Sequence, residues 1–395
     1  MQLNRGRPLT AMPGPSVIPD QVLDAMHRPM PNIYEGSLID TSVSVFEDLP
    51  KIAQTCGKAF MAISNGHGAW EMALTNTLSR GDKVLVLESG RFAVGWGEQA
   101  KMLGAEVEIL RAPDRHPVNP AAVERYLRED REHRVKAILV VQVDTASGVW
   151  NDIAAIRRAI DAANHPALFM VDCIASLACV EYRMDEWGVD VTVGGSQKGL
   201  MVPPGLGIVW AGRRAMDAHA SADMRSPYWD WTNRLSESAH YLRYCGTAPI
   251  QHIYAMRTAL DMLQAEGLET VWARHAIFAD AVRAAVAAWA APGGLEFNVL
   301  DPRHRSNSTT TILTGNIDGE RLRRLCEDYA GLTLGIGLGD LAQRSFRIGH
   351  MGALNPPMVL GTLGTVEAAL TAIEGPMPHS GVASAATVIA TAFNS

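Results

Sequence analysis

The sequence is poor in several features, and each absence argues against a class of protein. Five cysteines are scattered over 395 residues, an odd number without the spacing of a metal site, so we expect neither a disulfide framework nor a zinc centre. No uninterrupted apolar run reaches the roughly 20 residues that span a bilayer. Residues 1–8 lack the apolar stretch of a signal peptide. These absences predict a soluble protein of a reducing compartment, the cytoplasm.

Positive charge and nucleotide-binding motifs are also scarce. Lys and Arg total 35 against 42 Asp and Glu, a net charge of −7, and no basic run interrupts this balance, which argues against nucleic-acid binding. Residues 335–340 read Gly-Ile-Gly-Leu-Gly-Asp, which departs from the dinucleotide fingerprint at its sixth position and lies late in the chain. No Walker phosphate loop and no HExxH metal motif are found, so we expect no nicotinamide cofactor and no metal.

What the sequence does contain is a regular alternation of strand and helix patterns. Strands are expected over 83–87, 107–110, 137–141, 167–172, 189–193 and 207–210, with helices over 91–103, 119–128 and 153–163. Near-continuous apolar strands separated by helices are typical of a mostly parallel sheet covered on both faces. The predicted fold is therefore α/β.

The rest of the chain predicts three further parts. A long helical stretch covers about 250–292, and strands and helices mix over about 295–375, as in a small α+β domain. We divide the chain into an N-terminal arm (1–15), a large domain (16–250), a small C-terminal domain (251–375) and a tail (376–395). The tail is rich in Ala, Ser and Thr, and we expect it to be loosely packed.

Two charged residues stand at the ends of two predicted strands. Asp172 ends one strand, and Lys198 follows the next strand within the run Val-Gly-Gly-Ser-Gln-Lys-Gly-Leu. A carbonyl cofactor such as pyridoxal 5′-phosphate needs this pair, because a lysine amine condenses with its aldehyde and an acid keeps its ring nitrogen protonated. The alternative is a surface lysine and a helix-capping aspartate. Since the carboxyl ends of such strands form the usual ligand site, the pair favours catalysis.

Three loops carry further candidates. Asn65, Gly66 and His67 precede a helical pattern, and free N–H groups there would suit a phosphate, although an ordinary turn explains the same residues. Thr145 lies in a hydroxyl-rich loop that either contacts a cofactor or caps a helix. Arg347 lies between Phe and Ile in an apolar strand, where it would hold a substrate carboxylate or form a structural ion pair.

The segment 194–200, followed by Pro203-Pro204-Gly205, resembles the cofactor-lysine segment of the class V aminotransferases of fold type I, and in particular the serine–glyoxylate and alanine–glyoxylate branch. Further matches follow in the family's order over residues 13–352. They are 13–15 (Pro-Gly-Pro), 66–67 (Gly-His), 81–85 (Gly-Asp-Lys-Val-Leu), 145–149 (Thr-Ala-Ser-Gly-Val), 171–172 (Val-Asp), 196–198 (Ser-Gln-Lys) and 347–349 (Arg-Ile-Gly). The ordered set is far more specific than any of its parts.

The resemblance implies a role for each of these residues. Lys198 would hold the cofactor and move the proton between substrate and cofactor, Asp172 would pair with the ring nitrogen, and Arg347 would bind the substrate carboxylate. The other implied cofactor contacts are Asn65, Gly66, His67 and Gln197 at the phosphate, with Ser196 a less certain neighbour, Phe92 and Ile174 on the two ring faces, and Thr145 at the ring hydroxyl. Tyr244 and Thr247 would reach the phosphate of a neighbouring subunit, which implies a homodimer with shared sites.

The activity implied is ping-pong transfer of an amino group from a small L-amino acid to glyoxylate or a similar 2-oxo acid. The family's pattern is not followed over 31–36, 64–68 and 173–175, so serine, alanine and aspartate all remain possible donors. Aspartate would require a second cation, for which Arg91, Arg243 and Arg344 are candidates. Alternatives are a ureidoglycine–glyoxylate aminotransferase, a small-amino-acid lyase and a non-catalytic homologue serving as a scaffold.

Overall fold

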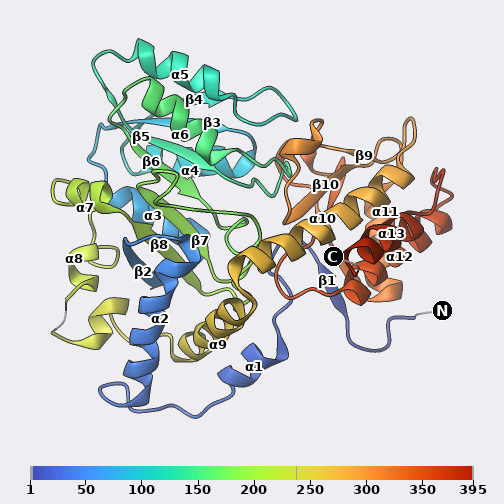
Figure 1. The fold of residues 1–395 in the computed structure, drawn as a ribbon, viewed down its shortest axis with the longest axis horizontal. Coiled ribbons are helices and arrows are strands. Elements are labelled where there is room, and N and C mark those ends of the chain that lie inside the picture. Colours follow the sequence, from blue (N-terminus) through green and yellow to red (C-terminus); the bar gives the residue numbers. More distant parts are fainter. Residues whose placement is uncertain (1–2, 237, 394–395) are drawn as a thin grey trace.

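A seven-stranded sheet forms the centre of the larger of two domains in the computed structural model, which describes residues 3–236 and 238–393 (Figure 1). Its strands are β2 (Lys58–Ile63), β3 (Lys83–Glu88), β4 (Glu106–Arg111), β5 (Val135–Val141), β6 (Leu168–Asp172), β7 (Val191–Gly195) and β8 (Leu206–Ala211). The order across the sheet is β2-β8-β7-β6-β5-β3-β4. β8 runs antiparallel to its neighbours β2 and β7, while the pairs from β7 to β4 are parallel. The mostly parallel sheet predicted from the sequence is confirmed.

Helices cover both faces of this sheet because its strands are apolar on both sides. In β3, Val84 and Val86 pack into one core and Leu85 and Leu87 into the other, as the alternation of side chains along a strand requires. The first face carries α3 (Gly66–Thr75), α4 (Arg91–Met102), α7 (Arg213–His219) and α8 (Trp231–Arg234). The second face carries α1 (Asp20–Met26), α2 (Ser37–Ala53), α5 (Pro120–Glu129), α6 (Ile153–Ala162) and α9 (Ile250–Glu266).

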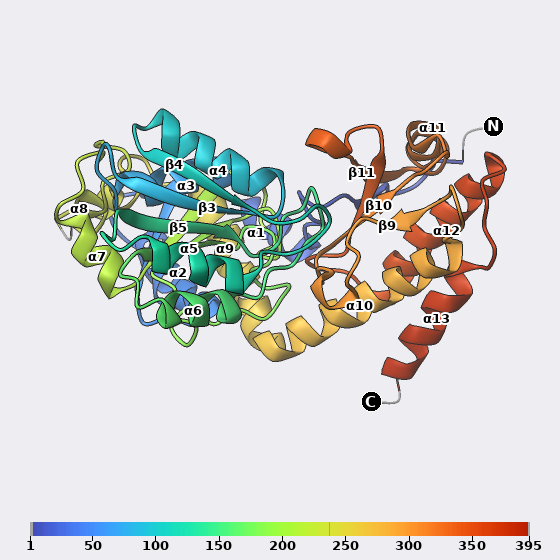
Figure 2. The same cartoon turned by 90° about the horizontal axis from the view of Figure 1, so that it is seen from above.

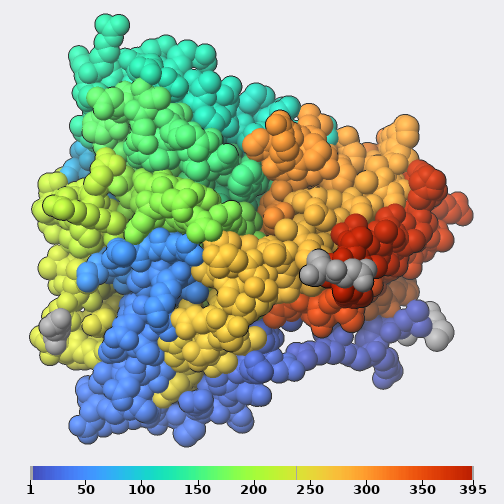
Figure 3. Space-filling model, viewed as in Figure 1, coloured from blue at the N-terminus to red at the C-terminus, as the bar shows by residue number. Residues whose placement is uncertain are grey.

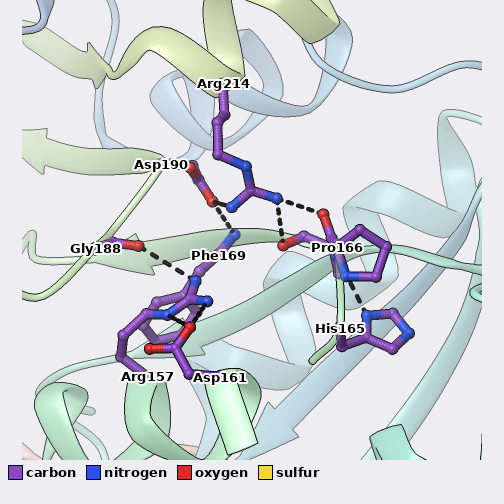
Figure 4. Close-up of polar contacts among 9 residues, drawn as sticks. Arg157, Asp161, His165, Pro166, Phe169, Gly188, Asp190 and Arg214 are labelled. Carbon is purple, nitrogen blue, oxygen red and sulfur yellow. Dashed lines mark hydrogen bonds and ion pairs between the residues drawn. The ribbon is translucent and has the colours of Figure 1, made fainter. Parts of the chain in front are cut away.

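A buried carboxylate fixes the amino-terminal ends of β6 and β7, the strands that carry the candidate site at their other ends (Figure 4). Asp190, just before β7, accepts a hydrogen bond from the N–H of Phe169 in β6 at 2.7 Å. The same carboxylate pairs with Arg214 of α7 at 2.8 Å, and Arg214 also donates to the carbonyl of Ala167. These contacts connect β6, β7 and α7 at the end of the sheet opposite the candidate site.

The small domain is built on a five-stranded sheet of order β1-β11-β12-β10-β9. Its elements are β1 (Leu9–Ala11), α10 (Leu268–Trp289), β9 (Glu296–Phe297), β10 (Thr309–Leu313), α11 (Gly319–Arg324), β11 (Leu332–Ile336), β12 (Ser345–Gly349), α12 (Pro356–Ala372) and α13 (Gly381–Ala392). Helix α10 runs from the large domain into the small one and supports this sheet (Figure 2). The chain also has short helical turns η1 (His240–Tyr244), η2 (Pro302–His304), η3 (Leu325–Tyr329) and η4 (Gly339–Leu341).

The structure differs from the predicted division of the chain in three places, namely the arm, the domain boundary and the tail. The arm is not a separate part, because β1 pairs in parallel with β11 and the N-terminal chain follows the surface to the small domain (Figure 3). Helix α9 packs into the core of the large domain, so the boundary lies within α10 and not at residue 251. The expected loose tail contains α13, which packs against α10 through Ala385 and Ile389.

Within the described ranges 3–236 and 238–393, no helix is both long and apolar enough to cross a membrane.

Candidate active site

Lys198 follows β7 and is half-buried near the junction of the domains. Its Nζ donates a hydrogen bond to the carbonyl of Pro13, and Gly14 is so close that a Cβ there would lie 2.5 Å from that nitrogen. Ser16 fixes the backbone from the other side, with its Oγ 2.7 Å from the Lys198 carbonyl oxygen. The 13–16 segment therefore requires glycine where it crosses the lysine, and the N-terminal arm forms one wall of the site.

Burial sets the charge state of this lysine. Loss of solvent and, to a smaller extent, the Arg347 guanidinium lower the pKa of Lys198 to about 8, and the Asp172 carboxylate opposes both. About a tenth of the amine is therefore neutral at pH 7, far more than for an ordinary lysine, and the neutral form is the one that a nucleophile or general base requires.

Asp172 is the last residue of β6 and is 3% exposed. One carboxylate oxygen accepts the indole N–H of Trp70 at 2.8 Å, and the other accepts the backbone N–H of Ile174 at 2.7 Å. Burial raises the pKa of Asp172 to about 7; these two hydrogen bonds and the Lys198 amine lower it, while the Asp144 carboxylate raises it. Asp172 therefore does not cap a helix: its carboxylate is buried and interacts with Lys198.

Aromatic rings surround the Asp172–Trp70 pair. The ring centroids of His67 and Phe92 lie 4.6 Å and 6.4 Å from that of Trp70, and Trp96 stacks on Trp70 at 6.0 Å. His67 and Phe92 were predicted from the sequence as cofactor contacts, whereas Trp70 was not. Only its place in the apolar pattern of α3 was visible, and that pattern is the same for a packing residue and for a hydrogen-bond donor.

A second buried carboxylate, Asp144, was also missed. It accepts the N–H groups of Phe92 at 2.8 Å and of Ala146 at 2.9 Å, and it lies so close to Gly90 that a Cβ there would be 2.3 Å away. Burial raises its pKa, and the hydrogen bonds oppose that shift. Asp144 therefore fixes the loop of Thr145 against the start of α4, where Phe92 lies.

Arg347 lies in the centre of β12 and is 7% exposed. Its Nε donates to the carbonyl of Ile336 at 2.6 Å and its Nη1 to the carbonyl of Thr145 at 2.9 Å. Burial lowers its pKa to about 10, and Asp144 opposes the shift. Arg347 connects the small domain to the Thr145 loop of the large domain, and the structural ion pair considered from the sequence is not found among the described residues.

The candidate phosphate residues lie together at the start of α3. Asn65 caps this helix by accepting the N–H of His67 and Gly68, and Ile174 packs so closely on Gly66 that a Cβ there would lie 2.3 Å from its Cδ1. The side-chain oxygen of Gln197 is buried and has no hydrogen-bond partner among the described residues. Ser196 differs from its predicted role, because its hydroxyl donates to the Pro203 carbonyl and accepts from the Leu206 N–H.

The chemistry of this group of side chains fits pyridoxal phosphate. It offers an amine of lowered pKa, a buried carboxylate for the ring nitrogen, and apolar side chains at Phe92 and Ile174 for the ring faces. Position 66 has to be glycine, because any side chain there would displace Ile174.

Tyr244 and Thr247 are not part of this group within one chain. Tyr244 is 1% exposed, and its hydroxyl is hydrogen-bonded to that of Ser42 in α2. Burial raises its pKa. Thr247, by contrast, is exposed. The two residues therefore differ: the Tyr244 hydroxyl already has a partner, and the Thr247 hydroxyl faces the surface.

Comparison with known proteins agrees with this geometry. The family model described as aminotransferase class-V matches residues 58–339. The chain belongs to the class V aminotransferases. It is a transaminase of fold type I and depends, like the family, on pyridoxal 5′-phosphate.

Several relatives of this aminotransferase have glyoxylate in their names. It is 38% identical to the serine–glyoxylate aminotransferase of Arabidopsis thaliana over 389 residues, covering 97% of this chain and 96% of the relative. It is 37% identical to the L-aspartate–glyoxylate aminotransferase of Paracoccus denitrificans over 379 residues, covering 95% and 94%. The solved ureidoglycine–glyoxylate aminotransferase of Bacillus subtilis superposes with a TM-score of 0.89 at 26% identity, covering 99% of this chain and 100% of that chain.

Proposed function

We propose that this aminotransferase moves the amino group of a small L-amino acid, namely serine, alanine or aspartate, to glyoxylate or a similar 2-oxo acid. The reaction would proceed in two half-reactions of a ping-pong cycle. The observation that carries the proposal is the half-buried Lys198 beside the buried side chains of Asp172 and Arg347, which both act on its pKa. The names of the relatives, serine–glyoxylate and L-aspartate–glyoxylate aminotransferase, support the choice of substrates.

Lys198 acts as the general base in this proposal. Its neutral Nζ takes the proton from the substrate Cα and returns it on the cofactor side, a transfer that the lowered pKa of about 8 favours. When bound, the cofactor supplies a ring that takes up the electron pair left behind. Asp172 keeps the ring nitrogen protonated, and Asp144 holds Thr145 and Phe92 in position.

Arg347 binds the carboxylate that both substrates share. A guanidinium has five N–H donors, and backbone carbonyls use one on Nε and one on Nη1. The two terminal nitrogens therefore keep hydrogens for a bidentate contact with a carboxylate. Because these two carbonyls fix the plane of the guanidinium, it is oriented before substrate arrives.

We further propose a homodimer with shared sites. Thr247 is exposed, and it lies just before α9, whose Gln251 contacts Met30. Met30 and Tyr34 are 70% and 74% exposed, which leaves apolar surface for a second copy to cover. The buried hydroxyl of Tyr244 makes Thr247 the better candidate for a contact across the interface.

The visible absorbance of the purified holoenzyme tests the donor. We expect serine, alanine or aspartate, added separately, to bleach the band of the lysine-bound cofactor, and glyoxylate to restore it. Bleaching that glyoxylate and other 2-oxo acids fail to reverse would contradict ping-pong transamination. The Lys198→Ala variant is the control, since it lacks the amine and should show neither change.

Two alternative activities would give different results in this absorbance experiment. A lyase would release product from the amino acid without any 2-oxo acid. A ureidoglycine–glyoxylate aminotransferase would be bleached by ureidoglycine and by none of the three proposed donors. The ureidoglycine activity is included because the structure resembles that of the Bacillus subtilis enzyme.

A further inference from the structure

The indole of Trp70 is a buried donor whose hydrogen bond ends on the carboxylate of Asp172. Trp70 lies one turn into α3, the helix that begins at the candidate phosphate residues, and is 1% exposed. Its Nε1 lies 2.8 Å from Asp172 Oδ2. The other oxygen, Oδ1, accepts from the Ile174 backbone, so each carboxylate oxygen has one protein donor. Each oxygen therefore keeps a lone pair for a further donor.

We propose that Trp70 is a positioning residue for the reaction, whose N–H holds Asp172 as a carboxylate directed at the ring nitrogen of the cofactor. The inference rests on the proposed role of Asp172 beside that nitrogen. An indole N–H can only donate, so its hydrogen bond is stronger to the ionised carboxylate than to the neutral acid, whose O–H it cannot accept.

Packing fixes the indole in the orientation that this hydrogen bond needs. Trp96 of α4 stacks on it with 14° between the ring planes, and His67 contacts it one turn earlier in α3. The indole therefore has little freedom to turn away from Asp172.

The physical effect is on the proton shared by Asp172 and the ring nitrogen. Burial favours the neutral acid, which would take that proton from the ring and weaken the electron sink. The Trp70 N–H opposes this, as do the Ile174 N–H and the Lys198 amine, whereas Asp144 acts in the opposite sense. A charge-assisted hydrogen bond shifts such an equilibrium by about tenfold or more.

The test compares Trp70→Phe with Trp96→Phe. Trp96 is equally buried, but its Nε1 has no hydrogen-bond partner among the described residues, so its replacement changes the stack and removes no hydrogen bond. Each holoenzyme is loaded with pyridoxal phosphate that carries an isotope label at the ring nitrogen, and NMR reports over a range of pH whether that nitrogen is protonated. Apoenzyme affinity for the cofactor is measured in parallel by fluorescence quenching.

Trp70→Phe should lower the ratio of protonated to neutral ring nitrogen about tenfold and weaken cofactor binding by a similar factor. Trp96→Phe keeps an aromatic ring against the Trp70 indole and leaves its N–H in place, so the ring nitrogen should stay as in the parent protein. An unchanged nitrogen signal in Trp70→Phe, or equal shifts in both variants, would show that Trp70 only packs. If Trp70→Phe does not fold, benzothienylalanine at position 70 keeps the shape without the N–H, and the same readings decide.

The Asp172→Asn variant separates this inference from the role on which it rests. If Asp172→Asn leaves the ring nitrogen protonated as before, the proposed role of Asp172 is wrong. If Asp172→Asn removes the proton and Trp70→Phe does not affect it, only the role of Trp70 is wrong.

Discussion

The lysine at the end of β7 shows how one residue takes its chemistry from its surroundings. On the surface an amine with an ordinary pKa would be almost fully protonated at neutral pH. Burial and the Arg347 guanidinium together lower the pKa of Lys198, while Asp172 prevents a larger shift. Asp172 and Arg347 lie in strands of two different sheets and Lys198 follows a third strand, so the pKa depends on the correct assembly of both domains.

This pKa predicts how the apoenzyme takes up its cofactor. Only the neutral amine attacks the aldehyde, so the rate of incorporation should rise about tenfold per pH unit below pH 8 and level off above it. Stopped-flow absorbance of apoenzyme mixed with pyridoxal phosphate measures the profile. Arg347→Gln removes a cation that lowers the pKa, so its plateau should begin at higher pH. A profile with its midpoint near the ordinary lysine value would contradict the burial argument.

The choice of donor is a second question at the scale of the residue. Of the three arginines considered for aspartate, Arg243 lies over the Phe46 ring at 5.3 Å, and Arg344 is exposed beyond η4. Arg91 begins α4 beside Phe92 and reaches Gly339 of the small domain, where a Cβ would lie 3.4 Å from its Cδ. Arg91 is therefore the best placed of the three, between the two domains and next to a predicted cofactor contact.

We expect Arg91→Ala to lower kcat/KM for aspartate about tenfold, the usual effect of losing a charge-assisted hydrogen bond, and to leave serine unchanged. Lys101→Ala is a matched control, because Lys101 is an exposed cation at the far end of the same helix. Steady-state kinetics with both donors gives the answer. An equal loss for serine and aspartate would assign Arg91 a general role and not donor selection.

At the scale of the element, the cluster around Asp190 fixes the two strands that carry Asp172 and Lys198. Asp190→Ala leaves the buried N–H of Phe169 unpaired and removes the ion pair with Arg214, so the free energy of unfolding should fall by about 3 kcal/mol. Urea denaturation measures this change. Arg213→Ala is the control, because the Arg213 side chain is 94% exposed and should have almost no effect. Equal midpoints for both variants would show that the cluster does not stabilise the strands.

The strands could be predicted from the sequence because burial on both faces gives runs that are almost entirely apolar. The domain boundary could not, since α9 has apolar residues whichever domain covers it. Helix α13 was missed for a different reason. Its small residues give little contrast between faces, while its start is fixed by Ser380 and by Glu367, which accepts the N–H groups of Gly381 and Val382.

The site was predicted from the sequence to the extent that spacing in the chain reflects position in the sheet. Asp172 and Lys198 follow neighbouring strands, so their meeting could be inferred. The partners of Asp172 could not, because Trp70 comes from a helix about a hundred residues earlier in the chain. Asp144 was likewise read only as part of a hydroxyl-rich loop, and its three backbone partners require the folded loop to be seen.

At the scale of the whole molecule, the question is whether one chain makes a complete site. Within a single chain Thr247 is exposed and apolar side chains at Met30 and Tyr34 face outward. Closed two-fold dimers are the commonest oligomers, and in them each copy contributes the same surface. If Thr247 serves the partner's phosphate, each site contains Lys198 from one copy and Thr247 from the other.

Mixed dimers test this arrangement. Thr247→Glu places a negative charge where the proposed contact with a phosphate lies, so it and Lys198→Ala should each be inactive alone. With shared sites, a dimer of one Lys198→Ala and one Thr247→Glu subunit has one site with both defects and one with none. Random reassembly should then restore about a quarter of the parent activity, because about half of the dimers are mixed and each has one intact site. Thr387→Glu, on the exposed face of α13, should keep full activity and shows the effect of the charge itself. If each site were confined to one chain, Thr247→Glu would instead be active alone, because Thr247 lies outside the site of its own chain.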